Sequence, residues 1–283
     1  MEILTSLQNW FHARRADFDA VVFDVDGVLI LDGRPVPGSL EFVDALRNRQ
    51  TPLALLTNDG NHSIAEKNAF LRHAGFNFQD GEITSCAHGL VEVASTLGLT
   101  GKQVFVAGDF GNPSYATAAG LTPVTGLADM SGCAAILIGE DSYDWQTTID
   151  AIVNHLILHP ETPLIVPNPD EYYPRRGGGI HVAAGGTARF IAQIMTSYGR
   201  PVAPLFLGKP YRPIFAHNHA VMQQRAGCSM DARRVLMVGD SLMSDVCGGH
   251  DFGYQTALLL TGITRNHHLE QARLAPDFAF AGY

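Results

Sequence analysis

The chain has 283 residues, of which 46% are hydrophobic and 17% charged, and its formal net charge is −9. This length accommodates one large domain or two of moderate size, and the composition is that of an ordinary globular protein. An acidic chain repels nucleic acids and anionic membrane surfaces, so we expect no nucleic acid polymer and no membrane as partner. To bind a phosphorylated ligand, such a chain would need local positive charge or hydrogen-bond donors from a cation, backbone amides or a single lysine.

The four cysteines lie far apart and form no C-x-x-C pair. This spacing argues against a zinc ribbon and against a disulfide framework, and it suits a reducing compartment. The first twenty residues make a poor signal peptide, and no run of 18 uncharged apolar residues occurs. We therefore expect a cytoplasmic protein.

Short β-branched runs alternate with longer segments of helical periodicity, which predicts parallel βα units. Strands are expected at residues 20–23, 53–57, 104–107, 135–138, 164–166, 205–207, 235–238 and 256–260. Helices are expected at 40–48, 63–74, 89–97, 145–159, 186–198, 212–226 and near 244–250, with an outer amphipathic helix at 3–14. The region from about residue 87 to 195 has strands and helices of its own, and we interpret it as a second α/β unit inserted into the first.

Two carboxylates follow the strand expected at 20–23. Asp24 and Asp26 lie two residues apart, so in an extended chain both side chains lie on one side of the backbone. Gly27 then allows a sharp turn. The carboxyl end of a parallel strand is where α/β sheets bind ligands, although a turn with an aspartate at each end is the alternative.

Two further strands end in groups suited to phosphate. Thr57 and Asn58 close the strand at 53–57, where a hydroxyl and adjacent N–H groups can hold a phosphate oxygen. A helix cap is the alternative for this pair. Lys209 follows the apolar run at 205–207 and would neutralise a crowded anionic centre, but an ordinary surface lysine fits the pattern equally well.

A fourth strand, at 235–238, brings two more aspartates. Asp240 stands at its tip, and Asp245 follows five residues later near a helix start, where a helix N-terminal position is the alternative. Four aspartates at one sheet edge would not all stay ionised without a cation. Oxygen ligands with no His or Cys partner favour Mg²⁺ over zinc.

The order of these segments resembles the four motifs of the haloacid dehalogenase superfamily, which are seen here as DVDGVL, LLTN, GKP and GDSLMSD. Three more segments resemble its class IIA branch, the NagD and p-nitrophenylphosphatase type: LILDGRPVPGSLEFVDAL, VPNPDEYYP and FGYQTALLLTG. The resemblance spans about residues 19 to 264. It implies an α/β fold with a Rossmann-like, doubly wound parallel-sheet core and an inserted α/β cap of the C2 type. The expected domains are a discontinuous core at 1–86 and 196–283 and a cap at 87–195.

The resemblance also implies a Mg²⁺-dependent phosphomonoester hydrolase. Asp24 would attack phosphorus and form an aspartyl-phosphate, and Asp26 would act as general acid and then general base. Thr57, the amide of Asn58 and Lys209 would hold the phosphoryl group. The dehalogenases of the superfamily lack the second aspartate, so Asp26 favours phosphoryl transfer.

The implied metal site uses the same strand ends. Asp240, the carboxylate of Asp24 and the backbone carbonyl of Asp26 would bind Mg²⁺, and Asp245 would support them directly or through water. The second motif commonly continues with asparagine where this chain has Asp59. An extra carboxylate there would either disfavour very anionic substrates or point away.

The cap is expected to close over the site and select the substrate. Its segment NPDEYYPRR offers Asn168 and Asp170 as substrate contacts, with Arg175 less favoured, and a structural turn is the alternative. GEDSYDW resembles a segment of nucleotide phosphatases, which favours a small phosphorylated metabolite, a nucleotide or a sugar phosphate. A homo-oligomer formed through the cap is left open. The competing functions are a phosphotransferase or mutase of the same superfamily and a catalytically retired binding or assembly module.

Overall fold

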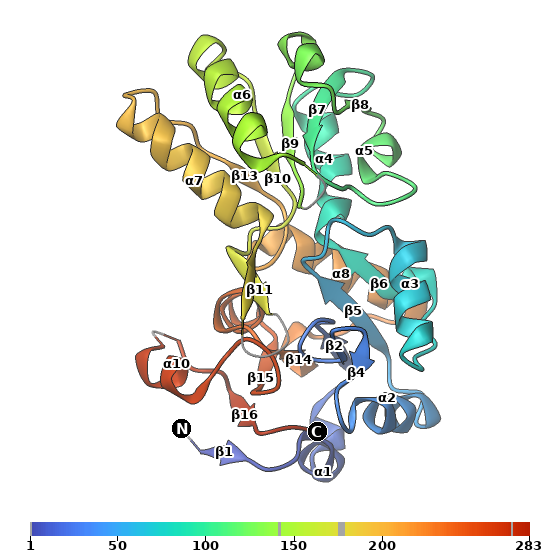
Figure 1. Ribbon diagram of the computed structural model, residues 1–283. Coiled ribbons are helices and arrows are strands. Elements are labelled where there is room, and N and C mark those ends of the chain that lie inside the picture. The colour runs from blue at the N-terminus through green and yellow to red at the C-terminus, as the bar shows by residue number, and fades with distance from the viewer. Residues whose placement is uncertain (1, 141–142, 175–178, 273) are drawn as a thin grey trace.

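The computed structural model describes residues 2–140, 143–174, 179–272 and 274–283. Two separate parallel sheets form its framework, and each has helices on both faces (Figure 1). The predicted doubly wound α/β architecture with a second α/β unit is confirmed.

The first sheet contains the strands that carry the predicted motifs. In spatial order its seven parallel strands are β1 (Ile3–Leu4), β16 (Phe278–Phe280), β15 (Gln255–Leu259), β14 (Val235–Gly239), β2 (Ala20–Phe23), β5 (Leu53–Thr57) and β6 (Ile83–Ser85). Strand β2 lies between β14 and β5, with Phe23 opposite both Val238 and Leu55. The residues that follow these three strands therefore meet at one edge.

Alternate residues of the central strands pack into two different layers. Val21 and Phe23 share a cluster with residues of α1 (Leu7–Ala13), α2 (Ser39–Asn48) and α3 (Ile64–His73). Val22 belongs to the cluster on the opposite face, with residues of α8 (Arg212–Ala226), and α9 (Gly248–Phe252) packs there too. Strands buried on both faces are continuous apolar runs, which is why they could be predicted from the sequence.

The second sheet is smaller and is also wholly parallel. Its order is β13 (Leu205–Phe206), β10 (Leu164–Val166), β9 (Ile136–Ile138), β7 (Gln103–Ala107) and β8 (Thr122–Val124). One face packs on α4 (Gly89–Thr96) and α5 (Tyr115–Ala118), the other on α6 (Trp145–Leu158) and α7 (Ala184–Ser197).

The remaining elements are short. Two hairpins pair β3 (Ile30–Leu31) with β4 (Arg34–Pro35) and β11 (Tyr172–Pro174) with β12 (Ile180–Val182), and α10 (Asn266–Gln271) precedes β16. The 3₁₀ turns are η1 (Arg15–Asp17), η2 (Asp80–Glu82), η3 (Cys86–His88), η4 (Leu127–Gly132) and η6 (Ala232–Arg234). Within the described residues no helix combines the length and apolarity needed to cross a bilayer. The four cysteines are free thiols.

Three local expectations were wrong. The helix expected at 3–14 begins only at Leu7, after the N-cap Ser6, because Ile3 and Leu4 pair with β16 as an edge strand. The helix expected near 244–250 starts earlier, as the π-helical turn η7 (Leu242–Cys247) that leads into α9. Residues 205–206, expected with the first unit, pair with β10 in the second sheet. The domain boundaries at 86/87 and 195/196 stay a prediction.

Candidate active site

A cavity of about 820 Å³ lies between the carboxyl ends of the first sheet and the loops of the second. Predicted site residues from both units line it: Asp24, Asp26, Thr57, Asn58, Asn168, Asp170 and Asp240. Lys209 and Asp245 lie behind this wall and are almost fully buried. Arg175 lies outside the described residues.

Asp24 is held by the sheet and by a buried lysine. Its amide donates to Val238 O at 2.9 Å, which continues the β2–β14 pairing by one residue. Its Oδ1 lies 2.8 Å from Lys209 Nζ, and Lys209 is only 1% exposed. Burial raises the pKa of the Asp24 carboxyl, and the lysine opposes this rise. Burial would lower the pKa of Lys209, but Asp24 and Asp245 outweigh it and raise that pKa, so the lysine stays charged.

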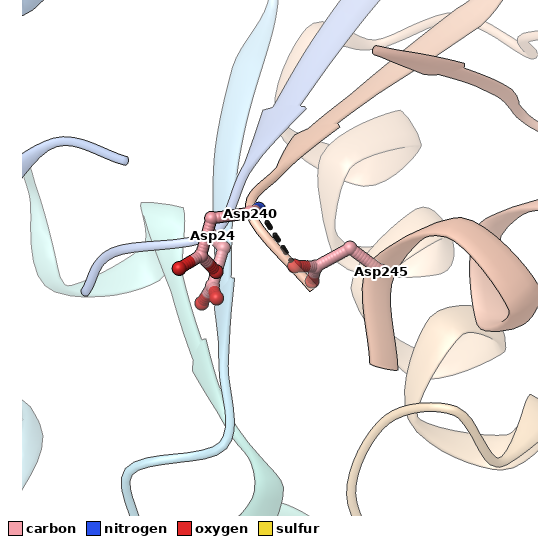
Figure 2. Close-up of side chains that lie close together, drawn as sticks. All are labelled: Asp24, Asp240 and Asp245. Atoms are coloured by element: carbon pink, nitrogen blue, oxygen red, sulfur yellow. Dashed lines mark hydrogen bonds between the residues drawn. The ribbon is translucent and has the colours of Figure 1, made fainter. Parts of the chain in front are cut away.

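Three buried carboxylates converge beside that lysine. Figure 2 shows Asp24 and Asp240 at adjacent strand ends, with Asp245 reaching toward them from η7. One oxygen from each of Asp24, Asp240 and Asp245 lies within 4.8 Å of the others. Burial raises the pKa of Asp240 well above its usual value, and the neighbouring Asp24 and Asp245 add to this. One lysine does not balance three carboxylates, so the cluster suits a divalent cation with oxygen ligands.

The oxygens of these carboxylates differ in their occupation. Asp245 uses both: Oδ1 accepts from Lys209 Nζ at 2.7 Å, and Oδ2 accepts from the amides of Asp240 and Ser241, each at 3.1 Å. Asp240 Oδ2 accepts from the Ile263 amide at 2.5 Å. Within the described ranges, no hydrogen bond reaches Oδ2 of Asp24 or Oδ1 of Asp240. Those two oxygens are the ones available to a ligand.

Glycines let the backbone approach this cluster closely. A methyl group on Gly27 or Gly262 would overlap the Asp240 carboxylate, and one on Gly239 would overlap Asp245. Gly27 also has a φ of +78°, a conformation that side chains rarely adopt. The aspartates are therefore fixed by their surroundings and not only by their own rotamers.

Asp26 lines the same cavity as Asp24 but is more exposed. Burial by the surrounding wall, with Asp59 adding, raises the pKa of its carboxyl to about 6, against the opposing effect of Lys67 and Lys209. A carboxyl group with such a pKa can give and take a proton near neutral pH.

Thr57 and Asn58 have different tasks. Thr57 Oγ1 accepts from the Asp59 amide at 3.1 Å, which leaves its O–H as a donor. The Asn58 side chain ties the second and third motifs together: Oδ1 accepts from the Lys209 amide at 2.8 Å, and Nδ2 donates to Lys209 O at 2.9 Å. Only the backbone amide of Asn58 was predicted to act at the site. The two side-chain bonds, which fix the backbone position of Lys209, were not predicted.

Asp59 lines the cavity, but its charge is neutralised. Its Oδ2 lies 3.3 Å from Lys67 Nζ and 3.0 Å from His62 Nδ1. Burial would raise the pKa of Asp59, yet Lys67 and His62 outweigh it and lower that pKa to about 2. Lys67 was missed because a lysine in a helix of ordinary periodicity looks like a solvated one, whereas it is 5% exposed. Of the two options for this position, the structure does not show a side chain that points away: Asp59 lines the cavity, with Lys67 and His62 as partners.

Asn168 and Asp170 both reach the cavity wall with internal partners. Asn168 Nδ2 donates to Glu140 Oε1 at 2.6 Å, and its Oδ1 accepts from the Asp170 amide at 2.9 Å. Asp170 Oδ2 accepts from Asn58 Nδ2 at 3.0 Å. The structural-turn interpretation therefore accounts for much of this segment, and contact with substrate stays a prediction for both residues.

Comparison with known proteins agrees with this geometry. The family profile of haloacid dehalogenase-like hydrolases matches residues 21–122, and a HAD-hydrolase-like profile matches residues 206–282. Human chronophin is 30% identical over 266 residues, covering 89% of this chain and 83% of that protein. The ribonucleotide monophosphatase NagD of Escherichia coli K12 is 26% identical over 261 residues, covering 92% and 94%.

Two further likenesses complete the comparison. The acid sugar phosphatase of Staphylococcus haemolyticus is 24% identical over 265 residues, covering 93% of each chain. The crystal structure of E. coli K-12 NagD superposes with a TM-score of 0.72 at 25% identity, covering 94% of this chain and 96% of that one. The fold, the order of the four motifs at the strand ends and these matches agree. The chain belongs to the haloacid dehalogenase superfamily, in its class IIA branch of phosphatases.

Proposed function

We propose that this chain is a Mg²⁺-dependent phosphomonoester hydrolase that works through an aspartyl-phosphate on Asp24. The observation that carries the proposal is the buried cluster of Asp24, Asp240 and Asp245 with Lys209 against it. Such a cluster places three carboxyl groups, a fixed positive charge and two carboxylate oxygens without a hydrogen bond at one cavity wall.

Each of these residues has a separate role in the proposed reaction. A carboxylate oxygen of Asp24 attacks phosphorus while the bond from phosphorus to the leaving oxygen breaks, and Asp26 donates a proton to that oxygen. A water then attacks phosphorus, Asp26 takes its proton, and the bond to Asp24 breaks to release phosphate. Thr57 Oγ1, the Asn58 amide and Lys209 hold and neutralise the phosphoryl oxygens.

The donor set fits Mg²⁺. Oδ2 of Asp24 and Oδ1 of Asp240 are the carboxylate oxygens that would hold it, with the Asp26 carbonyl as the third protein ligand. We assign Asp245 to the support of that shell through water, since both of its oxygens are engaged. When bound, Mg²⁺ supplies positive charge that offsets the carboxylates and the phosphoryl group.

A small phosphorylated metabolite is the proposed substrate. The names of two relatives specify ribonucleotide monophosphates and sugar phosphates for those proteins. A cavity of about 820 Å³ is in the range that encloses a small molecule. A mutase and a retired binding module are the alternatives, and neither is favoured by a specific observation. Cytoplasmic location and assembly through the cap stay predictions.

Release of p-nitrophenol from p-nitrophenyl phosphate tests the proposal. We expect hydrolysis that needs Mg²⁺, stops with EDTA and returns when Mg²⁺ is restored. A panel of nucleoside monophosphates and sugar phosphates then ranks substrates by kcat/KM. Absence of Mg²⁺-dependent hydrolysis across the panel would contradict the proposal, and transfer of phosphate to a second metabolite instead of water would favour the mutase.

A methyl group at Gly262 is expected to weaken the metal site without touching the nucleophile. In Gly262→Ala the new Cβ would overlap the Asp240 carboxylate, which must move. We expect the Mg²⁺ concentration for half-maximal activity to rise roughly 10–100-fold. Gly282→Ala is the matched control, because nothing lies within 4 Å of its added Cβ. Equal Mg²⁺ titration curves for both variants would show that the close packing of Gly262 against Asp240 does not determine the Mg²⁺ affinity.

A further inference from the structure

Glu140 is a buried carboxylate that takes no part in the proposed chemistry. It follows β9 of the second sheet and is 8% exposed. Three donors from three segments point at it: Asn61 Nδ2 lies 2.9 Å from Oε2, while Asn168 Nδ2 and the Ala184 amide lie 2.6 and 3.1 Å from Oε1. All three partners are donors, so the arrangement matches a carboxylate and not an amide.

The contact with Asn61 joins the two units of the fold. Asn61 lies in the loop between β5 and α3, and its bond to Glu140 is reciprocal, because the Glu140 amide donates to Asn61 Oδ1 at 3.2 Å. The Gly111 amide donates to Asn61 O at 2.7 Å, and Ser63 Oγ donates to Asn112 O at 2.7 Å. The loop of the second motif is therefore bound directly to two loops of the second sheet.

From Glu140 a line of hydrogen bonds continues to the nucleophile. Asn168 accepts from the Asp170 amide, Asp170 accepts from Asn58, and Asn58 makes two bonds to Lys209, whose Nζ contacts Asp24. The whole line crosses from the second sheet to the first. It gives a change at Glu140 a physical connection to the wall of the cavity.

Burying the Glu140 carboxylate costs desolvation free energy, which a purely structural contact does not require. Burial raises the pKa of its carboxyl to about 7, even though its three hydrogen bonds oppose the rise. A well-packed apolar side chain avoids that desolvation cost, so stability alone does not account for a glutamate here.

We propose that Glu140 is a positioning residue that holds the loops after β5 and β10 together over Asp24. This inference rests on the proposed function, because closing the cavity matters only if substrate is turned over there. We take substrate to bind only when the Glu140–Asn61 contact holds the two loops together. Weakening this contact lowers the fraction of molecules that can bind substrate, and the apparent KM rises by the factor by which that fraction falls. Substrate at saturation restores that arrangement, so kcat changes little.

Glu140→Gln disrupts the contact with Asn61 with almost no change in side-chain shape. The glutamine Oε1 can still accept from Asn168 and Ala184, but its amide group then faces Asn61 Nδ2. Rotating the Asn61 amide brings its N–H group against the Glu140 backbone N–H, so one pair of donors always clashes. We expect KM for p-nitrophenyl phosphate to rise roughly 10–100-fold, with kcat within about threefold of wild type.

The reciprocal geometry offers a rescue, and measuring KM separately from kcat and unfolding temperature distinguishes positioning from a merely structural role. In the double variant Asn61→Asp with Glu140→Gln, the side-chain amide at position 140 donates to one oxygen of the carboxylate introduced at position 61, and the backbone amide of residue 140 donates to the other. Both bonds are restored: donor and acceptor are exchanged between the two side chains, the backbone amide of residue 140 remains a donor, and net charge is unchanged. Asn61→Asp alone sets two carboxylates against each other and is expected to raise KM at least as much as Glu140→Gln.

The four proteins are to be compared by kcat, KM and thermal unfolding with Mg²⁺ present. Recovery of KM in the double variant supports the proposal. A wild-type KM in Glu140→Gln overturns it, as does a double variant no better than the single ones. A fall in kcat at constant KM, in step with lower unfolding temperature, also overturns it by showing loss of folded enzyme. If wild type itself hydrolyses no phosphoester, the proposed function fails instead.

Discussion

Replacement of Asp24 by asparagine is expected to lower the hydrolysis rate by at least roughly 10⁴-fold, because the proposed nucleophile is lost while the shape of the side chain is kept. The amide also places an uncharged oxygen or an N–H group at the proposed Mg²⁺ ligand position, so metal affinity is expected to fall as well. Rapid-mix assays with excess enzyme measure the residual rate, and mass spectrometry of acid-quenched wild type searches for a phosphorylated Asp24.

Asp26→Asn is the matched control for that variant. It removes a carboxylate that opens into the same cavity, and we expect a loss of roughly 10²–10⁴-fold, the usual contribution of general acid–base catalysis. The loss should be smaller for p-nitrophenyl phosphate than for an alkyl phosphate, since a good leaving group needs less protonation. An Asp24→Asn enzyme that keeps more activity than Asp26→Asn would contradict the assignment of the nucleophile.

Lys209→Met is expected to reduce both activity and stability. The change leaves two buried carboxylates, those of Asp24 and Asp245, without their shared cation at 2.8 and 2.7 Å. Removing one partner of a buried ion pair typically costs about 3–5 kcal/mol of unfolding free energy. In the proposed mechanism Lys209 also neutralises the phosphoryl group, and loss of such a charge is expected to cost roughly 10²–10³-fold in rate. Urea unfolding in EDTA measures the first effect without metal binding.

The loss of stability should depend on pH. Burial already raises the pKa of Asp24 in the wild type, and removing the lysine that opposes it raises that pKa further above its unfolded value. The folded state then binds protons more strongly than the unfolded state, so the deficit shrinks as pH falls and grows as pH rises.

The other buried lysine of the cavity region provides the comparison for Lys209→Met. Lys67→Met removes a cation 3.3 Å from Asp59, but Asp59 keeps His62 as a partner at 3.0 Å and is less buried. We expect a stability loss of about 1–3 kcal/mol and retention of most activity. Equal losses of activity in both variants would show that the effect is general destabilisation and that Lys209 has no special place at the phosphoryl group.

The central strands and the residues after them could be predicted because their signal is local. β2, β5 and β10 were predicted with their observed bounds, since a strand buried on both faces is a continuous apolar run. The short strands β6, β8 and β16 were missed because each is only three residues long, too short to give a clear strand signal.

The partners of the site residues could not be predicted, because their signal is not local. Glu140 and Asn61 are 79 positions apart, and the side chain of Asn58 meets Lys209 across 151 positions. Neither pair has a sequence pattern that distinguishes it from a turn or a solvated side chain. Only the fold brings them together.

The position of β14 beside β2 has a consequence for biogenesis. Neighbouring residues of these strands are far apart along the chain: Arg234 and Asp19, which bond to each other just before them, are separated by 215 positions. During synthesis β2 therefore exposes an unpaired edge until most of the polypeptide has been made, and such edges promote aggregation. Because Asp240 and Asp245 are on the same late segment, the carboxylate cluster with Asp24 is completed only as that edge is covered.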